Sequence, residues 1–218
     1  GLRRAAIGII RLILGSGVDL NLTEILDDKV QKNEVPKDDI IHFLHDRLKV
    51  LLRDKGLRYD IIEACIKVPN SDNFVVVEQK IEALSSFLET DDGTELLKGF
   101  RRANNILVSE EKKDGVKYEL DPEEKYMTNL YEKSLFLALE NAKSEVYRDL
   151  EKKDFVSVLS KMSKLLPLID DFFKEVKVND QSNVIRRNRL CLLNGVRNVC
   201  CYLGDLSLIQ DLNSQSNN

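Results

Sequence analysis

The sequence predicts an all-α protein, a helical bundle of two packed helical subdomains. The chain of 218 residues contains only 4 Pro and 10 Gly, whereas Leu, Lys, Glu and Asp are abundant. Apolar residues recur at the helical spacing of about 3.6 along most of the chain, and the alternation typical of strands is nearly absent. At this length the chain can bury a substantial core, as one large domain or two small ones.

The N-terminal segment predicts a helix over residues 2–14, ended by the Gly-Ser-Gly run that follows. Arg3, Arg4 and Arg11 lie on this helix without acidic neighbours. We interpret them as a face that packs against another part of a longer chain rather than as a nucleic-acid contact. Because helical periodicity starts at once and no Met precedes it, we expect the sequence to be an excised portion of a longer protein.

Capping signals mark the next helices. Asn21 with Glu24 resembles a capping pair that opens a helix through Val30. Pro36 suits the first turn of a longer helix, and Gly56 is favourable just beyond its end. These residues predict two further helices in the first subdomain.

A short helix over residues 59–68 follows, and Asp72 is expected to cap the next one. The Asp-Asp-Gly cluster at 91–93 is the clearest break between helices. We place the domain boundary there. Residues 1–92 then form a helical body segment, the C-terminal part of a larger domain, and residues 93–218 form a second bundle.

The second bundle begins with a helix from Thr94 that carries LLKGFRRANNIL. A charged segment over residues 110–120 is too hydrophilic for a core and is expected to be a loop. Asp121 and Pro122 then predict the start of a helix that continues to about Leu150, since Asp can cap a helix and Pro suits its first position.

Asp154 is expected to cap the next helix, and Pro167 to kink or end it. Phe172 and Phe173 resume the apolar face after this proline. Because both phenylalanines are in period with aliphatic neighbours, we assign them to the core rather than to a base-stacking platform.

The last predicted helix covers residues 180–203 and is basic, although the whole chain has a formal net charge of -4. On a helical wheel Arg186 and Arg197 lie beside the apolar arc and Arg187 lies further towards solvent, where the three can meet a polyanion. Arg189 projects into the apolar arc. Its guanidinium must be ion-paired beneath the surface or extend out of it, and we interpret it as architectural.

Three runs near the C-terminus resemble the DALR-type anticodon-binding domain: FFKEVKVND at 172–180, IRRNRLCLL at 185–193 and DLSLI at 205–209. More closely, they resemble the C-terminal end of the beta-subunit family of bacterial two-subunit glycyl-tRNA synthetases. LRRAAIGIIRLIL, DRLKVLLRDKG and FRRANNIL extend this likeness over nearly the whole chain. At 183–186 the chain has Asn-Val-Ile-Arg where the domain's name implies Asp-Ala-Leu-Arg, so only the aliphatic residue and the arginine match.

The resemblance implies a cytoplasmic parent protein that attaches glycine to its tRNA with ATP, as an assembly of two alpha and two beta chains. The ATP and glycine site is expected on the alpha subunit. The present segment would dock the anticodon arm and hold no cofactor. The implied partners are glycine tRNA and the alpha subunit.

Arginine suits an anticodon contact because its planar fork grips phosphates and stacks on unpaired bases. Asn188 is a candidate base reader, although it lies away from the arginines on the wheel and can instead cap or brace the packing. Arg101 and Arg102 can alternatively pair with acid-rich segments at 110–111 or 123–124. The candidate tRNA contacts are Arg186, Arg187, Arg197, Asn188, Lys98, Arg101 and Arg102.

His42, His45 and Asp46 lie on one predicted helix, and the pair His45–Asp46 superficially matches the signature dyad of metal-dependent phosphohydrolases. We reject a metal site, because the chain has 2 His in total, both on one predicted helix, and a hydrolytic site needs ligands from several elements. The four cysteines lack metal-ligand spacing and fit a reducing cytosol.

No phosphate-binding glycine loop, nucleophile with a histidine partner or apolar membrane-length run is visible. The negative net charge argues against indiscriminate binding of nucleic acid, and DNA is not expected as a partner. The alternative to an RNA-binding module is a helical protein-interaction scaffold, in which the same arginines pair with acidic partner surfaces.

Overall fold

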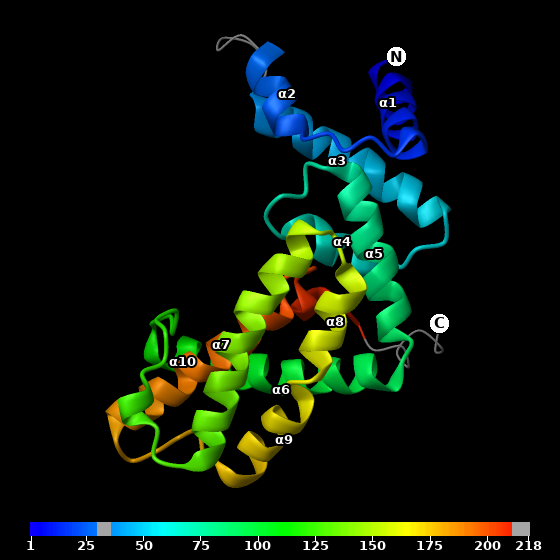
Figure 1. Ribbon diagram of the computed structural model, residues 1–218. Coiled ribbons are helices and arrows are strands. Elements are labelled where there is room, and N and C mark those ends of the chain that lie inside the picture. Colours follow the sequence, from blue (N-terminus) through cyan, green and yellow to red (C-terminus); the bar gives the residue numbers. More distant parts are fainter. Residues whose placement is uncertain (30–35, 211–218) are drawn as a thin grey trace, which may run out of the picture. The chain divides into compact units, whose positions relative to one another are not determined.

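The computed structural model describes residues 1–29 and 36–210, and this part of the chain folds into α-helices and two short 3-10 helices without a strand (Figure 1). The predicted all-α fold class is confirmed. The chain divides into two compact units. Unit 1 comprises residues 1–85 together with the segment from 203 onward, and unit 2 comprises residues 86–202. This division falls seven residues before the boundary expected at 92/93 and returns the C-terminal segment to unit 1.

Unit 1 is built around α3. This helix packs against α1, α2 and α4, and the 3-10 helix η2 packs against α4. Fully buried aliphatic side chains on α1, α3 and α4 form the core, among them Ile10, Leu48, Leu52, Ile61 and Ile62. The elements are α1 (Leu2–Ser16), α2 (Leu22–Lys29), α3 (Lys37–Asp54), α4 (Tyr59–Lys67), most of α5 (Phe74–Leu88) and η2 (Leu206–Leu208).

The starts of α2 and α5 show which capping predictions hold. Asn21 Oδ1 accepts a hydrogen bond from the backbone N–H of Glu24 at 3.1 Å, which confirms the capping pair. The end of that helix at Val30 lies outside the described residues. Asp72 does not cap α5: its carboxylate accepts from Thr23 N at 3.2 Å, at the start of α2, and Asn73 Oδ1 accepts from Val76 N instead.

The segment after residue 203 is tied to α4 and the turn before it. Asp205 N donates to Ala64 O at 3.0 Å. Gln210 N donates to the Asp60 carboxylate at 2.8 Å, and Arg58 donates to Gln210 O at 3.0 Å. Unit 2 is therefore inserted between two segments of unit 1 that bond to each other.

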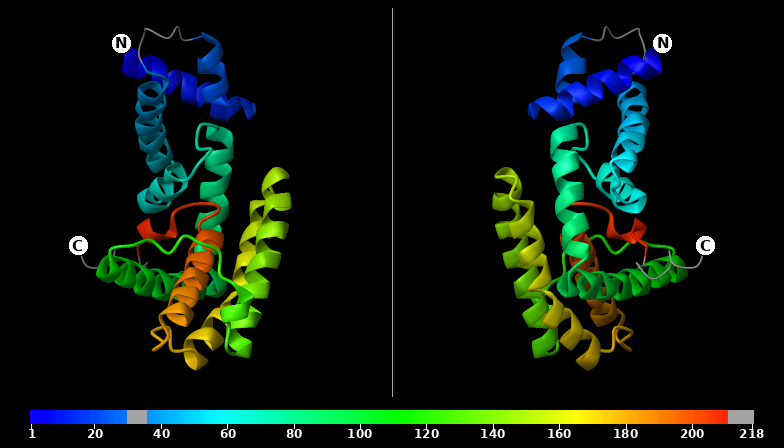
Figure 2. Two further views of the ribbon diagram at one scale, coloured as in Figure 1. Left: turned by 90° about the vertical axis from the view of Figure 1, so that its left-hand side faces the viewer. Right: turned by 90° about the vertical axis from the view of Figure 1, so that its right-hand side faces the viewer.

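Unit 2 is a bundle in which α6 and α7 both pack against α8, α9 and α10. Helices α7 and α8 run side by side, as Figure 2 shows. Its elements are α6 (Asp91–Asp114), η1 (Glu124–Tyr126), α7 (Leu130–Glu151), α8 (Phe155–Ser163), α9 (Leu166–Glu175) and α10 (Asn183–Cys200). Phe100, Leu107, Leu135, Phe172, Leu193 and Val196 are fully buried between them.

The predicted helix start at Asp121 and Pro122 is wrong. Only one 3-10 turn follows, and α7 begins later, at Leu130. Asn129 caps it by accepting from the backbone N–H of Glu132 at 3.0 Å. The helix starts at the Asn129 cap rather than at Asp121, because the segment around Glu123 is hydrogen-bonded to α10, as described below.

The predictions for α8 and α9 are confirmed. Asp154 Oδ1 accepts from Ser157 N at 3.0 Å and caps α8. The helix ends at Ser163, and α9 starts with Pro167 in its first turn. Within residues 1–29 and 36–210, no helix is long and apolar enough to cross a membrane.

Candidate nucleic-acid interface

Helix α10 places its arginines in three different environments. Its apolar stripe, including Leu190, Leu193 and Val196, is fully buried, and α10 packs on α6 and α7. Burial of this stripe fixes the rotation of the helix. The rotation therefore decides which arginines face α6 and α7 and which faces solvent.

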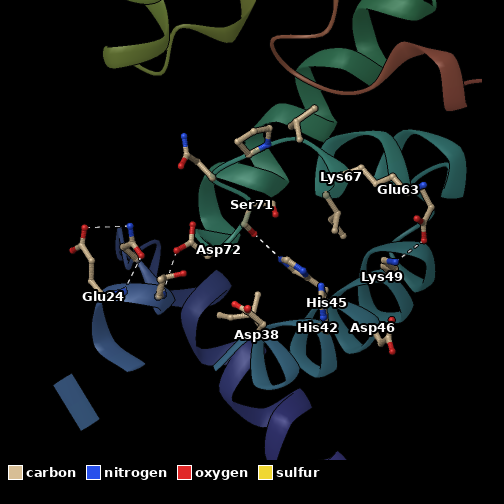
Figure 3. A pocket seen from close by; sticks show the side chains of 17 residues that line it. Glu24, Asp38, His42, His45, Asp46, Lys49, Glu63, Lys67, Ser71 and Asp72 are labelled. Atoms are coloured by element: carbon tan, nitrogen blue, oxygen red, sulfur yellow. Dashed lines mark hydrogen bonds and ion pairs between the residues drawn. The ribbon is translucent and has the colours of Figure 1, made fainter. Parts of the chain in front are cut away.

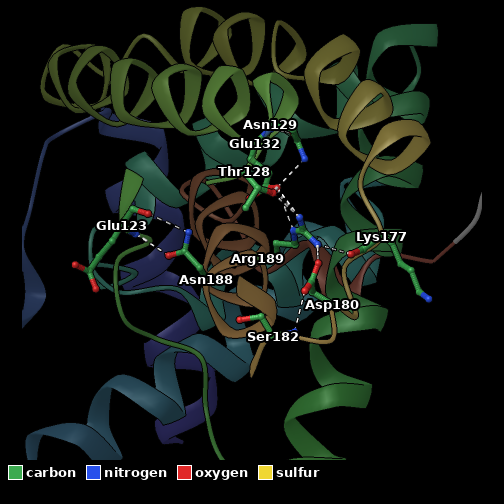
Figure 4. Close-up of polar contacts among 9 residues, drawn as sticks. All are labelled: Glu123, Thr128, Asn129, Glu132, Lys177, Asp180, Ser182, Asn188 and Arg189. Carbon is green, nitrogen blue, oxygen red and sulfur yellow. Dashed lines mark hydrogen bonds and ion pairs between the residues drawn. The ribbon is translucent and has the colours of Figure 1, made fainter. Parts of the chain in front are cut away.

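Arg189 lies inside the bundle (Figure 4). Its side chain is 6% exposed, and Nη2 contacts Glu132 Oε1 at 2.8 Å. On the other side Nη1 donates to Asp180 Oδ2 and to the backbone oxygen of Lys177, both at 2.8 Å. A third partner is the Thr128 hydroxyl, which accepts from Nη2 at 3.0 Å. Of the two options that the wheel leaves open, the structure shows the buried ion pair.

Arg186 is held at the C-terminal end of α6. Its Nη2 atom forms ion pairs with Glu110 and with Asp114, the latter at 2.5 Å. Nε donates to Asn179 Oδ1 at 3.0 Å, and Nη1 donates to the Tyr118 hydroxyl at 3.3 Å. The guanidinium is thus surrounded by partners from the fold itself.

These contacts change the acidity of the carboxyls. Hydrogen bonds from Arg186 and Asn179 lower the pKa of Glu110. A hydrogen bond from Tyr118, followed by that from Arg186, lowers the pKa of Asp114. Both carboxylates are therefore held in their charged form, which keeps the ion pairs with Arg186 intact at neutral pH.

Arg197 faces the neighbouring acid of α6. Nη2 contacts Glu111 Oε1 at 3.4 Å and donates to Asn194 Oδ1 at 2.6 Å. Glu111 also pairs with Lys117 at 2.7 Å. Burial raises the pKa of Glu111, but the hydrogen bonds from Lys117 and from the backbone of Tyr118 outweigh it, so that the pKa lies below its usual value.

The free cationic cluster that the sequence of α10 indicates is therefore largely neutralised by α6. Arg186 and Arg197 are part-buried and meet Glu110, Glu111 and Asp114. The sequence of α10 alone does not reveal this neutralisation. The acids belong to α6, which is distant in sequence but lies beside α10 in space. The acid-rich stretch at 110–114 was the sequence feature that could have indicated these ion pairs. Its carboxylates pair with Arg186 and Arg197.

Asn188 is also committed to the fold. Its Oδ1 atom accepts from Glu123 N at 2.7 Å, and its Nδ2 atom donates to Glu123 O at 3.1 Å (Figure 4). The Asn188 amide thus bonds to both the N–H and the C=O of Glu123, in the segment before η1. A base could be read by Asn188 only after this segment is displaced, and the geometry favours the bracing role.

Arg187 is exposed and forms no ion pair with any described residue. It lines a groove with a volume of about 390 Å³, together with Asp121 and Glu123. Among the α10 arginines it is the one whose guanidinium the fold leaves accessible within the described chain.

The α6 candidates differ in the same way. Lys98 is exposed and pairs with Glu95 at 2.6 Å, one helical turn away. Arg101 is half-buried. Arg102 is exposed, and its guanidinium carbon lies 4.4 Å from the centroid of the Phe173 ring. Phe172 is buried in the core, whereas Phe173 is only half-buried.

A separate pocket of about 910 Å³ lies in unit 1 (Figure 3). It contains His42, His45 and Asp46, and His45 Nε2 lies 2.8 Å from Ser71 O. Burial lowers the pKa of His45 despite this hydrogen bond. Among the described residues no group of three or more His, Cys, Asp or Glu side chains is arranged to hold a metal ion.

Comparison with known proteins identifies both regions. Residues 1–67 match the family model of the glycyl-tRNA synthetase beta subunit, and residues 96–203 match that of the DALR anticodon binding domain. The second match largely coincides with unit 2.

The chain is 42% identical over 218 residues to the glycine–tRNA ligase beta subunit of Cereibacter sphaeroides. It is 41% identical over 209 residues to that of Ruegeria sp. and 39% identical over 209 residues to that of Paracoccus denitrificans. Each alignment covers 96% of this chain, which spans about a third of the relatives' length, 31% for the first and 30% for the other two. The chain therefore belongs to the family of glycine–tRNA ligase beta subunits.

Proposed function

We propose that this chain is the tRNA-docking portion of a glycine–tRNA ligase beta subunit. One observation carries the proposal: the segment that matches the anticodon-binding family, 96–203, is nearly the same as the segment that folds as unit 2, 86–202. In this proposal unit 2 holds the anticodon arm of glycine tRNA. The complete cytoplasmic enzyme attaches glycine to that tRNA with ATP.

The catalytic step is assigned to the partner. The ATP and glycine site lies on the alpha subunit of a two-alpha, two-beta assembly, and this segment holds no cofactor. Its task is to bind tRNA so that the far end of the molecule reaches that site. This division fits the side chains of unit 2 described above, whose polar groups mostly form hydrogen bonds and ion pairs within the bundle.

The cations that contact RNA most readily are those whose side chains the fold leaves exposed. Arg102 and Arg187 are exposed, and Lys177 is exposed beside the same α6 surface as Arg102. Arg186 and Arg197 could contact phosphates only by exchanging their carboxylate partners. Phosphate contacts would supply affinity, and unpaired loop bases would supply discrimination.

The test is footprinting of glycine tRNA on the full-length two-subunit enzyme, with one other tRNA species as the comparison. Protection of the anticodon arm is expected, together with affinity that falls steeply with salt as phosphates are neutralised. Arg102→Glu with Arg187→Glu should weaken binding without loss of helicity. An unprotected anticodon arm, with equal affinity in this double variant, would instead favour the protein-interaction scaffold.

A further inference from the structure

A groove runs along unit 2 between α6 and the segment that links α9 to α10. Its volume is about 490 Å³, within the range of small-ligand sites. Its apolar lining includes Ile106, Val176 and Val178. The remaining lining is polar or aromatic, and its groups come from α6, from α9 and from the segment between α9 and α10.

The aromatic ring of the groove, that of Phe173, packs against the core. Phe172 is fully buried, and its ring meets Phe173 edge-on, with centroids 5.5 Å apart and planes inclined at 73°. The core thereby sets the plane of Phe173. The Arg102 guanidinium lies over this half-buried ring at 4.4 Å. An arginine stacked on an aromatic ring offers a flat cationic surface, which suits the π-face of a nucleobase.

Other groups in the groove are available for hydrogen bonds. The side chains of Asn105 and Ser109 are exposed and make no hydrogen bond to any described residue. Lys177 is exposed, and its ammonium pairs with no carboxylate in the described chain. Asn179, in contrast, is already used by Glu110 and Arg186.

The charge balance of the groove is positive. Among the described residues that line it Glu110 is the one acid, and Glu110 pairs with both Arg186 and Lys113. Within the part of the chain that the structure describes, Arg102 and Lys177 are cations of the groove without a carboxylate partner. An occupant with a planar ring, polar ring edges and an adjoining negative charge is complementary to this arrangement, and an unpaired nucleotide has all three.

We propose that this groove is a stacking subsite for one unpaired nucleotide of the bound tRNA. The base stacks on the Arg102–Phe173 pair, Asn105 and Ser109 bond to its edge, and Lys177 contacts its phosphate. The inference rests on the proposed function, because it specifies which part of the tRNA unit 2 holds. Stacking supplies affinity for any base, and the amide of Asn105 can distinguish bases by their donors and acceptors.

The experiment combines protein variants with abasic tRNAs. Glycine tRNAs carrying a single abasic nucleotide, placed at each anticodon-loop position in turn, are titrated against the full-length two-subunit enzyme. At one position the missing base should weaken wild-type binding about tenfold, the size expected for one lost stacking contact. Phe173→Leu should weaken binding of intact tRNA to the same extent, and the abasic change should then cause no further loss.

One further variant is a control and another is a second test of the stack. Tyr131→Leu removes another partly exposed aromatic ring of unit 2 that does not line the groove, and it should retain the full tenfold loss. Arg102→Gln changes an exposed side chain, so it tests the same stack without altering the core beneath Phe173. It should also remove the effect of the abasic nucleotide.

If tRNA binds and protects its anticodon arm, but every abasic loss is the same in wild type and in Phe173→Leu, the subsite is wrong and the docking function stands. Phe173→Leu could instead weaken the binding of intact tRNA and of every abasic tRNA by the same factor. The groove would then not hold the base that was removed, and the inference would be overturned. If no abasic position matters in wild type and the arm is unprotected, both the subsite and the proposed function fail.

Discussion

The Arg189 guanidinium donates two hydrogen bonds to the same oxygen of Glu132, at 3.1 Å from Nε and 2.8 Å from Nη2. The Glu132 side chain is 0% exposed. Its other oxygen has no hydrogen-bond partner among the described residues. The carboxylate therefore depends on Arg189, together with Thr128 and Asn129, for compensation of its charge.

Removing Arg189 should destabilise the protein strongly. Arg189→Ala leaves the Glu132 carboxylate buried without its cation, which typically costs about 3–5 kcal/mol of unfolding free energy. Arg187→Ala, at an exposed position of the same helix, should change it by less than about 0.5 kcal/mol. Urea unfolding measures both variants, and equal midpoints would contradict the architectural role. Replacing the pair by Arg189→Met with Glu132→Leu should recover much of the loss.

The Arg186 cluster should make stability depend on acid pH. Hydrogen bonds hold the pKa values of Glu110 and Asp114 below their ordinary values of 4.5 and 3.8. Their stabilisation is complete above those values and is lost as pH falls through the lower folded-state pKa values. The stability difference between wild type and Arg186→Gln should therefore shrink as pH falls from about 5 to about 2.

The matched control for this titration is Arg187→Gln, which removes one charge at the adjacent position, where no ion pair is formed with any residue that the structure describes. Its stability difference from wild type should stay nearly constant over the same pH range. Denaturant unfolding at a series of pH values measures both. A constant difference for Arg186→Gln as well would show that Glu110 and Asp114 are not stabilised by Arg186.

Truncation of Asn188 should loosen the segment before η1. Asn188→Ala leaves both the N–H and the C=O of Glu123 without their bonds to α10, at a cost of about 1–3 kcal/mol. Hydrogen exchange of the Glu123 amide should accelerate correspondingly. Asn198→Ala, at an exposed position of the same helix, should leave this exchange unchanged. Unaltered protection of Glu123 in Asn188→Ala would contradict the bracing role.

Two glycines of α6 should respond in opposite ways to alanine. A Cβ atom at Gly93 would lie 2.0 Å from the backbone oxygen of Phe87, so Gly93→Ala should destabilise by about 2–3 kcal/mol. At Gly99 the nearest atom, Ile169 Cγ2, is at 3.6 Å, an ordinary contact. Gly99→Ala should be neutral or gain up to about 1 kcal/mol from helix propensity. Thermal unfolding compares them, and equal melting temperatures would contradict the predicted clash at Gly93.

The sequence was sufficient for the fold class and for many helix ends, because these depend on local signals. The loop expected over residues 110–120 is wrong at its start, since α6 continues to Asp114. Asp154 and the Asn21–Glu24 pair cap helices as predicted. The local signal at Asp121 failed for a tertiary reason: Asn188, 65 residues away in sequence, binds the Glu123 backbone. Asp121 and Asn129 both offered a helix cap. The tertiary contact between Asn188 and Glu123, which neither local pattern contains, favours the cap at Asn129.

The candidate site shows the same limit. Periodicity correctly separates Arg189, which lies in the apolar arc, from Arg187, which lies in solvent. It cannot say which acids of another helix will meet Arg186 and Arg197. It also places Phe173 with Phe172, although only the packing of α6 against α9 shows that one ring is buried and the other lies beneath Arg102.

The return of residues 203–210 to α4 has a consequence for limited proteolysis. A protease cut between α5 and α6 would sever one of the two covalent connections to the inserted region. The other connection leads into residues 203–210, where the backbone amides of Asp205 and Gln210 donate hydrogen bonds to Ala64 and Asp60 of α4. The nicked protein should therefore migrate as a single particle on native sizing and separate into two fragments only under denaturing conditions.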